Sequence, residues 1–169
     1  MIKKHILIVL VAFFLIGCGN TNNNENNENS NTNSNSSNNS NTNSNVIIPE
    51  GKNIVNFYLF YSDSCSHCHE EIEWLKSIEK DYPYLVIHYY EASKNRDLYD
   101  RVKADYEITS TGVPLTIISN DYYIGFNDTR ARKFLRVIEE ESERENCDVV
   151  AKVIAKEDTK DCRAKNEIY

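Results

Sequence analysis

The sequence predicts an α/β fold in which a mixed sheet of four to five strands is flanked by helices, with an extra helical tail at the C-terminus. Two observations lead to this prediction. From residue 53 onward, short runs rich in Val, Ile, Phe and Tyr, which are typical of buried strands, alternate with segments of helical period. The resulting order is strand, helix, strand, helix, strand, strand, helix, which is typical of a mixed sheet covered by helices.

The first half of the domain is expected to contain two strands, each followed by a helix. In the first helix, Ile72, Leu75 and Ile78 recur every third position, and the polar residues 62–64 before it supply capping side chains. The glutamates within residues 70–73 are expected to lie where the helix dipole favours acids. The expected segments are a strand at residues 53–61, a helix within 62–82, a strand at 85–90 and a helix at 95–106.

The second half is expected to form a hairpin followed by a helix. The pair Asn120-Asp121 is suited to a tight turn between two apolar runs. Apolar residues between 149 and 154 predict one further short helix in the tail. The expected segments are a loop at residues 109–114, strands at 115–119 and 122–126, a helix at 129–143 and the tail at 146–169.

The N-terminal residues have the features of an export signal. Lys3 and Lys4 precede an uninterrupted apolar run at residues 6–16, which is shorter than the roughly 20 residues that span a bilayer. The run ends in Leu-Ile-Gly followed by Cys18, which resembles the lipobox of bacterial lipoproteins. In that family the cysteine receives a diacylglycerol, so the resemblance implies that residues 1–17 are a signal peptide that is removed. An ordinary signal peptide with a cysteine nearby by chance is the alternative.

The segment after Cys18 is expected to be a polar tether. Residues 20–45 consist of Asn, Ser and Thr apart from two glutamates, so they have no apolar surface to offset the entropy of ordering their backbone. We therefore expect residues 18–45 to tether a domain at 46–145, with 146–169 as a helical extension. The lipoprotein resemblance places this domain outside the cytoplasmic membrane, to which the lipid anchors it.

The charge of the chain argues against one class of partner. Its formal net charge is −7, and its basic residues form no stripe along the sequence. Domains that bind nucleic acids usually carry a basic patch for the phosphates. Nucleic acid is therefore not expected as a partner.

The five cysteines fall into three groups. Besides Cys18, they form the pairs Cys65 with Cys68 and Cys147 with Cys162. An exported protein meets an oxidising compartment, in which such pairs can form disulfides. A single helix over residues 147–162 would hold its cysteines about 22 Å apart, beyond the roughly 7 Å that a disulfide allows. A structural disulfide there requires the chain to turn back around residues 157–160, and two free thiols are the alternative.

The segment SDSCSHCHEE, residues 62–71, concentrates residues with redox and metal chemistry. Its two cysteines lie where the first expected strand passes into a helix, so that the helix N-terminus can stabilise a thiolate. Cys65 would then present an exposed sulfur, whereas Cys68, one turn later, would face inward. This arrangement predicts a redox pair in which Cys65 is the nucleophile and Cys68 the resolving thiol.

The C-x-x-C that follows a buried strand, together with Gly112-Val113-Pro114 before the hairpin, resembles thioredoxin over residues 53–143. The resemblance implies a thioredoxin-like fold and a thiol–disulfide oxidoreductase. It also implies that Pro114 is cis and that the backbone of Val113 lies beside the sulfurs and pairs with a substrate strand. The partners it implies for an exported protein are cysteine-containing exported proteins and a membrane redox partner.

The residues around the cysteines bear on the direction of electron flow. Ser66 and His67 lie between the cysteines, and His67 resembles the histidine of strongly oxidising periplasmic members, where it stabilises the thiolate. An exposed histidine with little effect is the alternative. Leu59 departs from thioredoxins, because it stands at the place of a buried aspartate that assists proton transfer. Proton transfer is then left to water, His69 or Glu71, and the direction of electron flow stays open.

The cysteine–histidine segment also fits three other interpretations. Cys-x-x-Cys-His is also the attachment motif of c-type haem. Most such haems need a second axial ligand, but the methionine of the chain, Met1, would be lost with the signal peptide. Cys65, Cys68, His69 and His88 could instead hold zinc or copper in a metal-binding or metal-delivery lipoprotein. A structural disulfide in a tethered binding protein is the third. The oxidoreductase interpretation requires no metal and no other cofactor.

Overall fold

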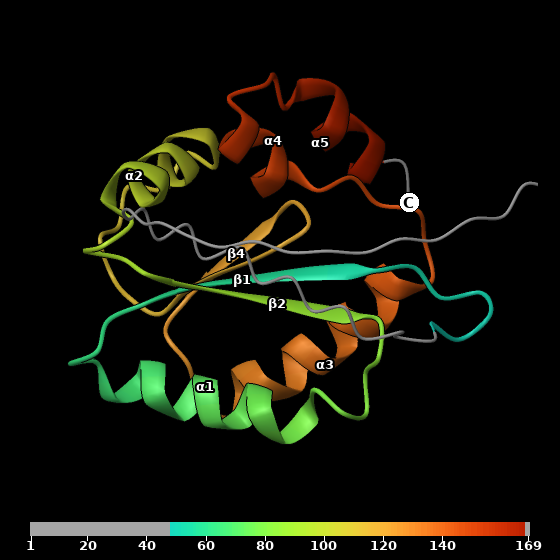
Figure 1. Ribbon diagram of the computed structural model, residues 1–169, viewed down its shortest axis with the longest axis horizontal. Coiled ribbons are helices and arrows are strands. Elements are labelled where there is room, and N and C mark those ends of the chain that lie inside the picture. The colour runs from blue at the N-terminus through green and yellow to red at the C-terminus, as the bar shows by residue number, and fades with distance from the viewer. Residues whose placement is uncertain (1–47, 168–169) are drawn as a thin grey trace, which may run out of the picture. The chain divides into compact units, whose positions relative to one another are not determined.

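The computed structural model describes residues 48–167, in which the chain forms a sheet with helices on both faces (Figure 1). The predicted signal peptide at 1–17, the lipid-attachment residue Cys18 and the tether up to residue 45 lie outside the described residues. Within the described range, no helix combines the length and the apolar character that crossing a membrane requires.

The strands are β1 (Val55–Tyr61), β2 (Leu85–Glu91), β3 (Leu115–Ile118) and β4 (Asp121–Ile124). They form one four-stranded sheet in the order β2-β1-β3-β4, which confirms the predicted mixed sheet. β1 runs parallel to β2 and antiparallel to β3, so that Leu59 lies opposite Thr116. The turn between β3 and β4 uses Ser119 and Asn120, one residue earlier than predicted, because Ser119 adopts the left-handed backbone (φ 54°) that a tight hairpin turn needs.

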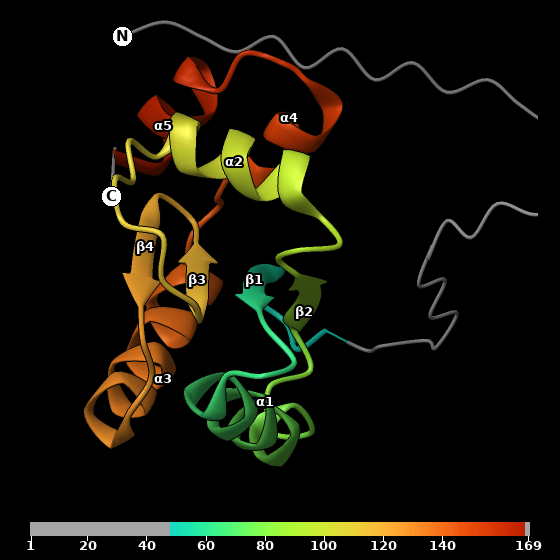
Figure 2. The ribbon, with the colours of Figure 1, turned by 90° about the vertical axis from the view of Figure 1, so that its left-hand side faces the viewer.

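Alternate residues of β1 point to opposite faces of the sheet and enter two separate cores. The helices that cover the sheet are α1 (Ser66–Ile78), α2 (Arg96–Asp105) and α3 (Asp128–Ser142). Phe57 and Leu59 pack in the core that α1 and α3 close. Tyr58 and Phe60 pack in the core on the other face, beneath α2. Figure 2 shows α1 and α3 together on one side of the sheet and α2 on the other.

The C-terminal residues form two short helices, α4 (Val149–Ala155) and α5 (Lys160–Glu167), where one was predicted. Helix α4 ends at Lys156, whose left-handed backbone (φ 59°) lets the chain reverse. The reversal brings Cys147 and Cys162 together in a disulfide, with their Cα atoms 5.2 Å apart. This is the arrangement that a continuous helix would have prevented.

Helix α4 packs into a core of the domain and not merely onto its surface. Val149 and Val150 are buried in the same cluster as Tyr58 and Phe60 of β1. The hydroxyl of Tyr58 also donates a hydrogen bond, 2.7 Å long, to Asp148, the N-cap residue of α4. The extension therefore shares with α2 the task of covering this face of the sheet (Figure 2).

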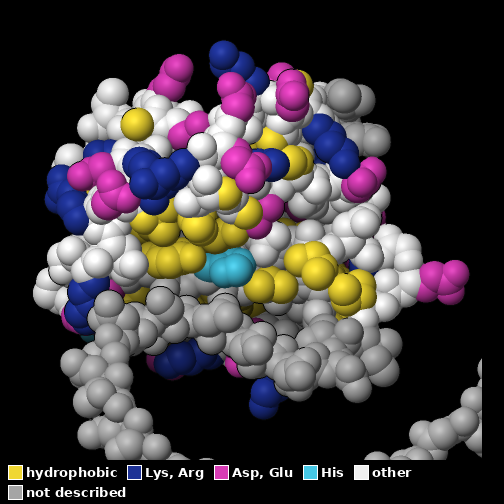
Figure 3. All heavy atoms as spheres, turned by 45° about the horizontal axis from the view of Figure 1, so that its top comes forward, with side chains coloured by type: hydrophobic (Ala, Val, Ile, Leu, Met, Phe, Trp, Pro, Cys, Tyr) yellow, Lys and Arg dark blue, Asp and Glu magenta, His cyan; other side chains and the backbone are white. Residues whose placement is uncertain are grey.

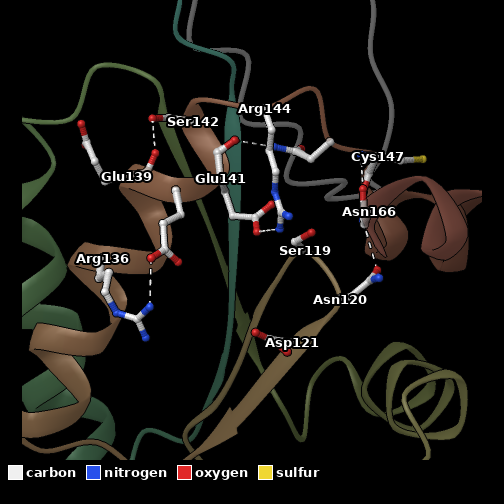
Figure 4. A network of polar contacts seen from close by, with 12 residues as sticks. Ser119, Asn120, Asp121, Arg136, Glu139, Glu141, Ser142, Arg144, Cys147 and Asn166 are labelled. Atoms are coloured by element: carbon white, nitrogen blue, oxygen red, sulfur yellow. Dashed lines mark hydrogen bonds and ion pairs between the residues drawn. The ribbon is translucent and has the colours of Figure 1, made fainter. Parts of the chain in front are cut away.

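Asn166 of α5 ties the end of the chain to the rest of the domain (Figure 4). Its side-chain oxygen accepts a hydrogen bond from the backbone N–H of Cys147, at 2.7 Å. Its amide nitrogen donates to the carbonyl of Cys147, at 2.9 Å, and to Asn120 in the β3–β4 turn, at 3.1 Å. The amide thus bridges the structural disulfide and the hairpin.

Candidate functional site

The pair of cysteines lies where β1 passes into α1. Cys65 and Cys68 are joined by a disulfide, with their Cα atoms 5.2 Å apart. Cys65 is the N-cap residue of α1, and its sulfur accepts a hydrogen bond from the backbone N–H of Cys68, at 3.1 Å. An N–H group that has no partner within the helix therefore points at the Cys65 sulfur, which favours a thiolate there once the disulfide is reduced.

The predicted capping by residues 62–64 is wrong. These residues form a turn in which the carbonyl of Ser62 accepts from the N–H of Cys65, at 3.0 Å, and the hydroxyl of Ser62 accepts from the N–H of Ser64, at 3.4 Å. The cap is left to Cys65, because the hydroxyls before it are used within the turn. The first turn of α1, which is described throughout, also holds no acid, so the glutamates expected to support the helix dipole begin only in the second turn.

The two sulfurs of the pair differ in exposure. Cys65 is partly exposed, whereas Cys68 is 0% exposed. The reason is helix geometry, since Cys68 belongs to the buried stripe that continues with Glu71 and Leu75 at spacings of three and four residues. A substrate disulfide that approaches the domain meets Cys65 first.

The loop before β3 lies against Cys65. Its Val113–Pro114 peptide bond is cis, and the carbonyl oxygen of Val113 lies 3.6 Å from the Cys65 sulfur, across 48 residues of sequence. The N–H of Gly125, just after β4, donates to the carbonyl of Pro114, at 2.9 Å. Tertiary structure thus places the predicted docking residues, Val113 and Pro114, beside the predicted nucleophile.

Gly112 allows this loop to pass close to β4. A Cβ atom at this position would lie 3.0 Å from the side chain of Ile124, so a larger residue would push the loop away from the strand. The hydroxyl of Tyr99 on α2 donates to the Gly112 carbonyl, at 3.2 Å. The backbone of Val113 is therefore held in place from α2 as well as from β4.

A buried glutamate lies on the inner face of α1. Glu71 is 0% exposed, and its Oε1 accepts a hydrogen bond from the hydroxyl of Thr116 on β3, at 2.5 Å. Its other oxygen, Oε2, has no hydrogen-bond partner among the described residues. Leu59 is also fully buried and pairs with Thr116 across the sheet. The carboxyl group of this site therefore comes from the helix, and Leu59 on β1 contributes an apolar side chain.

Burial raises the pKa of Glu71 from 4.5 to about 8, because a carboxylate removed from water is disfavoured relative to the neutral acid. The hydrogen bond from Thr116 and the positive charge of Arg130 oppose this shift without cancelling it. A group that exchanges its proton near neutral pH has the property that general acid–base catalysis needs.

The two residues between the cysteines lie on the outer face of α1. The side chain of His67 is 63% exposed, and its Nδ1 lies 3.0 Å from the carboxylate of Glu70. Ser66 is exposed as the first residue of the helix. A positive charge on His67 is thus partly balanced by Glu70 and screened by water, which weakens its action on the Cys65 sulfur.

Thr116 is the residue of this site that sequence analysis missed. It is the one hydroxyl residue in the strand LTII, and all four residues of that strand are buried. Because a buried hydroxyl needs a hydrogen-bond partner, this lone polar residue was a usable signal. A second signal was the spacing of Glu71, three residues after Cys68 and four before Leu75.

The geometry of the described chain offers no ready metal site. Residues 48–167 contain no group of three or more His, Cys, Asp or Glu side chains placed to hold a metal ion. His88, a ligand in the metal interpretation, stacks on Tyr58 with ring centroids 4.3 Å apart, and its Nε2 lies 2.9 Å from Oδ1 of Asn56. Burial lowers the pKa of His88. Figure 3 shows a histidine within a band of hydrophobic side chains, bordered by charges of both signs.

Comparison with known proteins finds structural neighbours but no match in sequence. No protein-family model matches the chain, and no curated protein matches it in sequence. Oxidised mitochondrial thioredoxin 3 from Saccharomyces cerevisiae is similar in structure, with 20% identity and a TM-score of 0.40 over 50% of this chain and 78% of that chain. Two structures of thioredoxin from Plasmodium falciparum are also similar. One has 18% identity and a TM-score of 0.40 over 54% of this chain and 86% of that chain. The other, the oxidised form in solution, has 22% identity and a TM-score of 0.40 over 53% of this chain and 83% of that chain.

The fold assignment rests on the architecture of the chain itself. Its element order, its strand order β2-β1-β3-β4 and the C-x-x-C at the start of α1 are those of a thioredoxin-like fold followed by two C-terminal helices. The fold class predicted from the sequence is therefore confirmed.

Proposed function

We propose that this protein is a thiol–disulfide oxidoreductase that exchanges disulfides with cysteine-containing exported proteins. The observation that supports this most directly is the Cys65–Cys68 disulfide at the N-terminus of α1, with the Cys65 sulfur 3.6 Å from the carbonyl oxygen of Val113. In this proposal Cys18 carries a lipid, residues 18–45 form the tether, and the reaction takes place outside the cytoplasmic membrane. A membrane redox partner restores the pair after each cycle.

The reaction proceeds through a mixed disulfide. In the reduced protein, the Cys65 thiolate attacks a sulfur of the substrate disulfide, the substrate S–S bond breaks, and one substrate thiolate leaves. The Cys68 thiolate then attacks the Cys65 sulfur, and the second substrate thiolate leaves. Two electrons have passed to the substrate, and Cys65 and Cys68 end as a disulfide. The reverse sequence oxidises a substrate dithiol, and the potential of the pair decides which direction prevails.

Proton transfer at Cys68 is assigned to Glu71 in this mechanism. Cys68 is 0% exposed, so its thiol proton does not pass directly to bulk water. Glu71 shares the buried face of α1 one turn further along, and its raised pKa of about 8 suits it to take the proton as Cys68 attacks and to return it in the reverse direction. His69, the alternative protein group for this transfer, is exposed to solvent.

Substrate docking uses the backbone of Val113. Its carbonyl already faces Cys65, and an extended substrate segment beside the sulfur can form main-chain hydrogen bonds with this residue as an added strand does. Such pairing holds the substrate sulfur close to Cys65 without requiring a particular side chain.

A redox titration tests the proposed function. The full-length protein in detergent, with Cys147→Ser and Cys162→Ser, would be equilibrated in glutathione buffers and followed by the fluorescence of Trp74 on α1 and by thiol trapping. We expect a reversible two-electron couple, at about −120 mV for a protein that introduces disulfides and at about −270 mV for a reductase.

Single-cysteine variants identify the roles of the two thiols. We expect Cys65→Ser to abolish catalysed exchange and Cys68→Ser to accumulate a mixed disulfide between Cys65 and the substrate. The absence of any reversible couple, or unchanged exchange in Cys65→Ser, would contradict the proposed function.

A further inference from the structure

The N-terminal half of α3 is strongly basic in an acidic protein. Residues 128–136 carry four cations and one acid, a net charge of 4 − 1 = +3, whereas the whole chain has a net charge of −7. The charged residues are Asp128, Arg130, Arg132, Lys133 and Arg136. Positive charge is thus concentrated on little more than two turns of one helix in a chain that is negative overall.

The stability of α3 does not account for this arrangement. A helix dipole favours acids in the first turn and bases in the last turn. Helix α3 has Asp128 in its first turn, but it also places Arg130 there, and its last turn, which is fully described, holds glutamates 139–141 and no base. Those glutamates have partners of their own, which are Lys52 and Tyr84 for Glu139, Arg136 for Glu140 and Arg144 for Glu141.

Three of the cations keep their charge unpaired and hold defined positions. Arg130 and Lys133 lie over the ring of Tyr123 on β4, at 5.1 and 4.7 Å from its centroid, and such contacts fix a cation without neutralising it. Arg132 donates a hydrogen bond to the hydroxyl of Thr129, at 3.2 Å. Within residues 48–167, none of the three forms an ion pair with a carboxylate. We refer to Arg130, Arg132 and Lys133 as the basic surface.

The basic surface begins next to the loop that carries Val113 and Pro114. Gly125 donates to the carbonyl of Pro114, at 2.9 Å, and the N-cap residue of α3, Asn127, follows two residues later. Two residues of chain span at most about 7 Å, and the helical rise from Asn127 to Arg132 adds about 7.5 Å. A substrate strand paired with Val113 advances about 3.3 Å per residue, so its residues four to six positions from the reacting cysteine reach the basic surface.

The other side of Cys65 carries acids that match or outnumber its cations. Asp63 lies 3.3 Å from Lys94, and His67 lies 3.0 Å from Glu70. Each of these pairs joins an acid to a basic group. Glu91 also accepts a hydrogen bond from the backbone N–H of Lys94, at 2.7 Å, so these residues hold no surplus of cations. Net positive charge near Cys65 therefore lies toward α3.

We propose that the basic surface binds acidic residues that flank the reacting cysteine of the substrate protein, and that this contact selects the substrates. The inference rests on the oxidoreductase function proposed above. The partner it describes is a polypeptide with two or more Asp or Glu residues four to six positions from its cysteine. Each exposed ion pair contributes little, but two or three together amount to about a tenfold preference and also steer the encounter.

The test compares disulfide-linked homodimers of one short peptide in three versions. At positions four to six from the cysteine, the peptide carries Glu, Gln or Lys. Cys65 of the reduced full-length protein attacks one sulfur of the dimer and releases one peptide thiolate, and Cys68 then releases the second, so that the dimer is reduced and the protein is oxidised. Because both halves of the dimer are identical, the same product forms whichever sulfur is attacked. The rate constant is followed by Trp74 fluorescence.

We expect the acidic peptide to react about tenfold faster than the Gln peptide at low ionic strength, with the difference largely lost at 0.5 M salt, where charges are screened within about 4 Å. In Arg132→Glu/Lys133→Glu, the order of the acidic and basic peptides should reverse. The matched control, Lys156→Glu/Lys160→Glu, makes the same change in net charge at two exposed residues near the end of α4 and the start of α5, and should keep the wild-type order.

The outcomes separate this inference from the proposed function. Equal rates with all three peptides, or equal effects of both double variants, would overturn the proposed role of the basic surface in substrate selection. The proposed oxidoreductase function would be unaffected by that result. No reaction with any peptide would instead remove the proposed function. The assay is repeated with protein in liposomes of neutral lipid and in liposomes that contain anionic lipid. A charge-reversal effect confined to anionic liposomes and equal for all peptides would assign the surface to the membrane and overturn the proposal.

Discussion

The two disulfides of the domain have the same span and contrasting surroundings. In both, the Cα atoms are 5.2 Å apart. The Cys65–Cys68 bond joins residues three apart, and the sulfur of Cys65 is partly exposed beside a loop from a distant part of the chain. The Cys147–Cys162 bond joins residues 15 apart, and Cys162 is 4% exposed within the core under α2 and α4. One bond is open to an incoming thiol, and the other is mostly covered.

The buried polar groups beside the two disulfides differ in charge and in hydrogen bonding. Asn166, beside Cys147, is neutral, and both its oxygen and its nitrogen form hydrogen bonds. Glu71, beside Cys68, is ionisable, and one of its oxygens has no partner among the described residues. Leaving a buried oxygen unpaired costs stability. The unpaired oxygen of Glu71 is explained by its role beside Cys68, where a proton moves in the proposed reaction. Both polar groups of Asn166 are paired, in keeping with a purely structural role for the disulfide of Cys147.

Glu71 offers the largest expected effect. Its pKa is raised in the folded protein, so the folded state keeps a proton that the unfolded chain releases above about pH 4.5. The stability that this proton contributes is fully present below about pH 4.5 and is lost as the pH rises through about 8. We expect Glu71→Gln to remove this pH dependence and to be more stable than the wild type at pH 9, by up to about 4 kcal/mol. Urea unfolding of the oxidised proteins from pH 5 to pH 9 measures the difference.

Glu73→Gln is the matched control for this experiment. Glu73 lies on the same helix with its side chain 73% exposed, so its replacement should leave the pH dependence of the wild type in place. Parallel curves of stability against pH for the wild type and Glu71→Gln would show that Glu71 does not hold a proton at neutral pH. The proposed difference between the ionisable group beside Cys68 and the neutral Asn166 beside Cys147 would then be wrong.

The second disulfide offers a smaller effect on stability and none on exchange. Cys147→Ser/Cys162→Ser should lower the free energy of unfolding by about 3 kcal/mol, the value expected when a loop of about 15 residues is no longer closed in the unfolded chain. The rate of disulfide exchange of this variant should stay within about twofold of the wild-type rate. Urea unfolding and the peptide exchange assay measure the two quantities.

The Cys65→Ser/Cys68→Ser variant completes this comparison. It should lose exchange altogether and lose less stability than the other double variant, because the loop that its bond closes is short. If the Cys147→Ser/Cys162→Ser variant stayed folded but stopped exchanging disulfides, the two bonds would not have separate roles.

His67 offers the smallest effect. Its side chain is mostly exposed and lies against Glu70, so we expect His67→Ala to lower the reduction potential of the pair by less than about 30 mV. Glu70→Gln should shift the potential the other way, because the histidine then acts on the Cys65 thiolate without a nearby negative charge. Glutathione titration measures both. A large drop in His67→Ala would mean that the histidine controls the thiolate directly.

The elements around the redox pair were predictable because their signals are local. The apolar run of β1 followed by C-x-x-C and a helical period placed Cys65 and Cys68 at a strand–helix junction, where the structure has them. Prediction failed where the local signal was weak or misleading. Helix α5 was missed because its buried residues are only Cys162 and Asn166, which make no apolar stripe. The cap of α1 was misassigned because a sulfur took the place of the expected hydroxyl.

The sequence by itself determined the order of strands and helices, the position of the redox pair and the pairing options of the cysteines, since these depend on residues close together in the chain. Only the tertiary structure decided that Val113 faces Cys65 and that Glu71, unlike its neighbours Glu70 and Glu73, is buried. The environment of a carboxyl group or a sulfur depends on what packs over it. For Glu71 that packing comes in part from Thr116 on β3, 45 residues away. No local pattern around Glu71 contains that information.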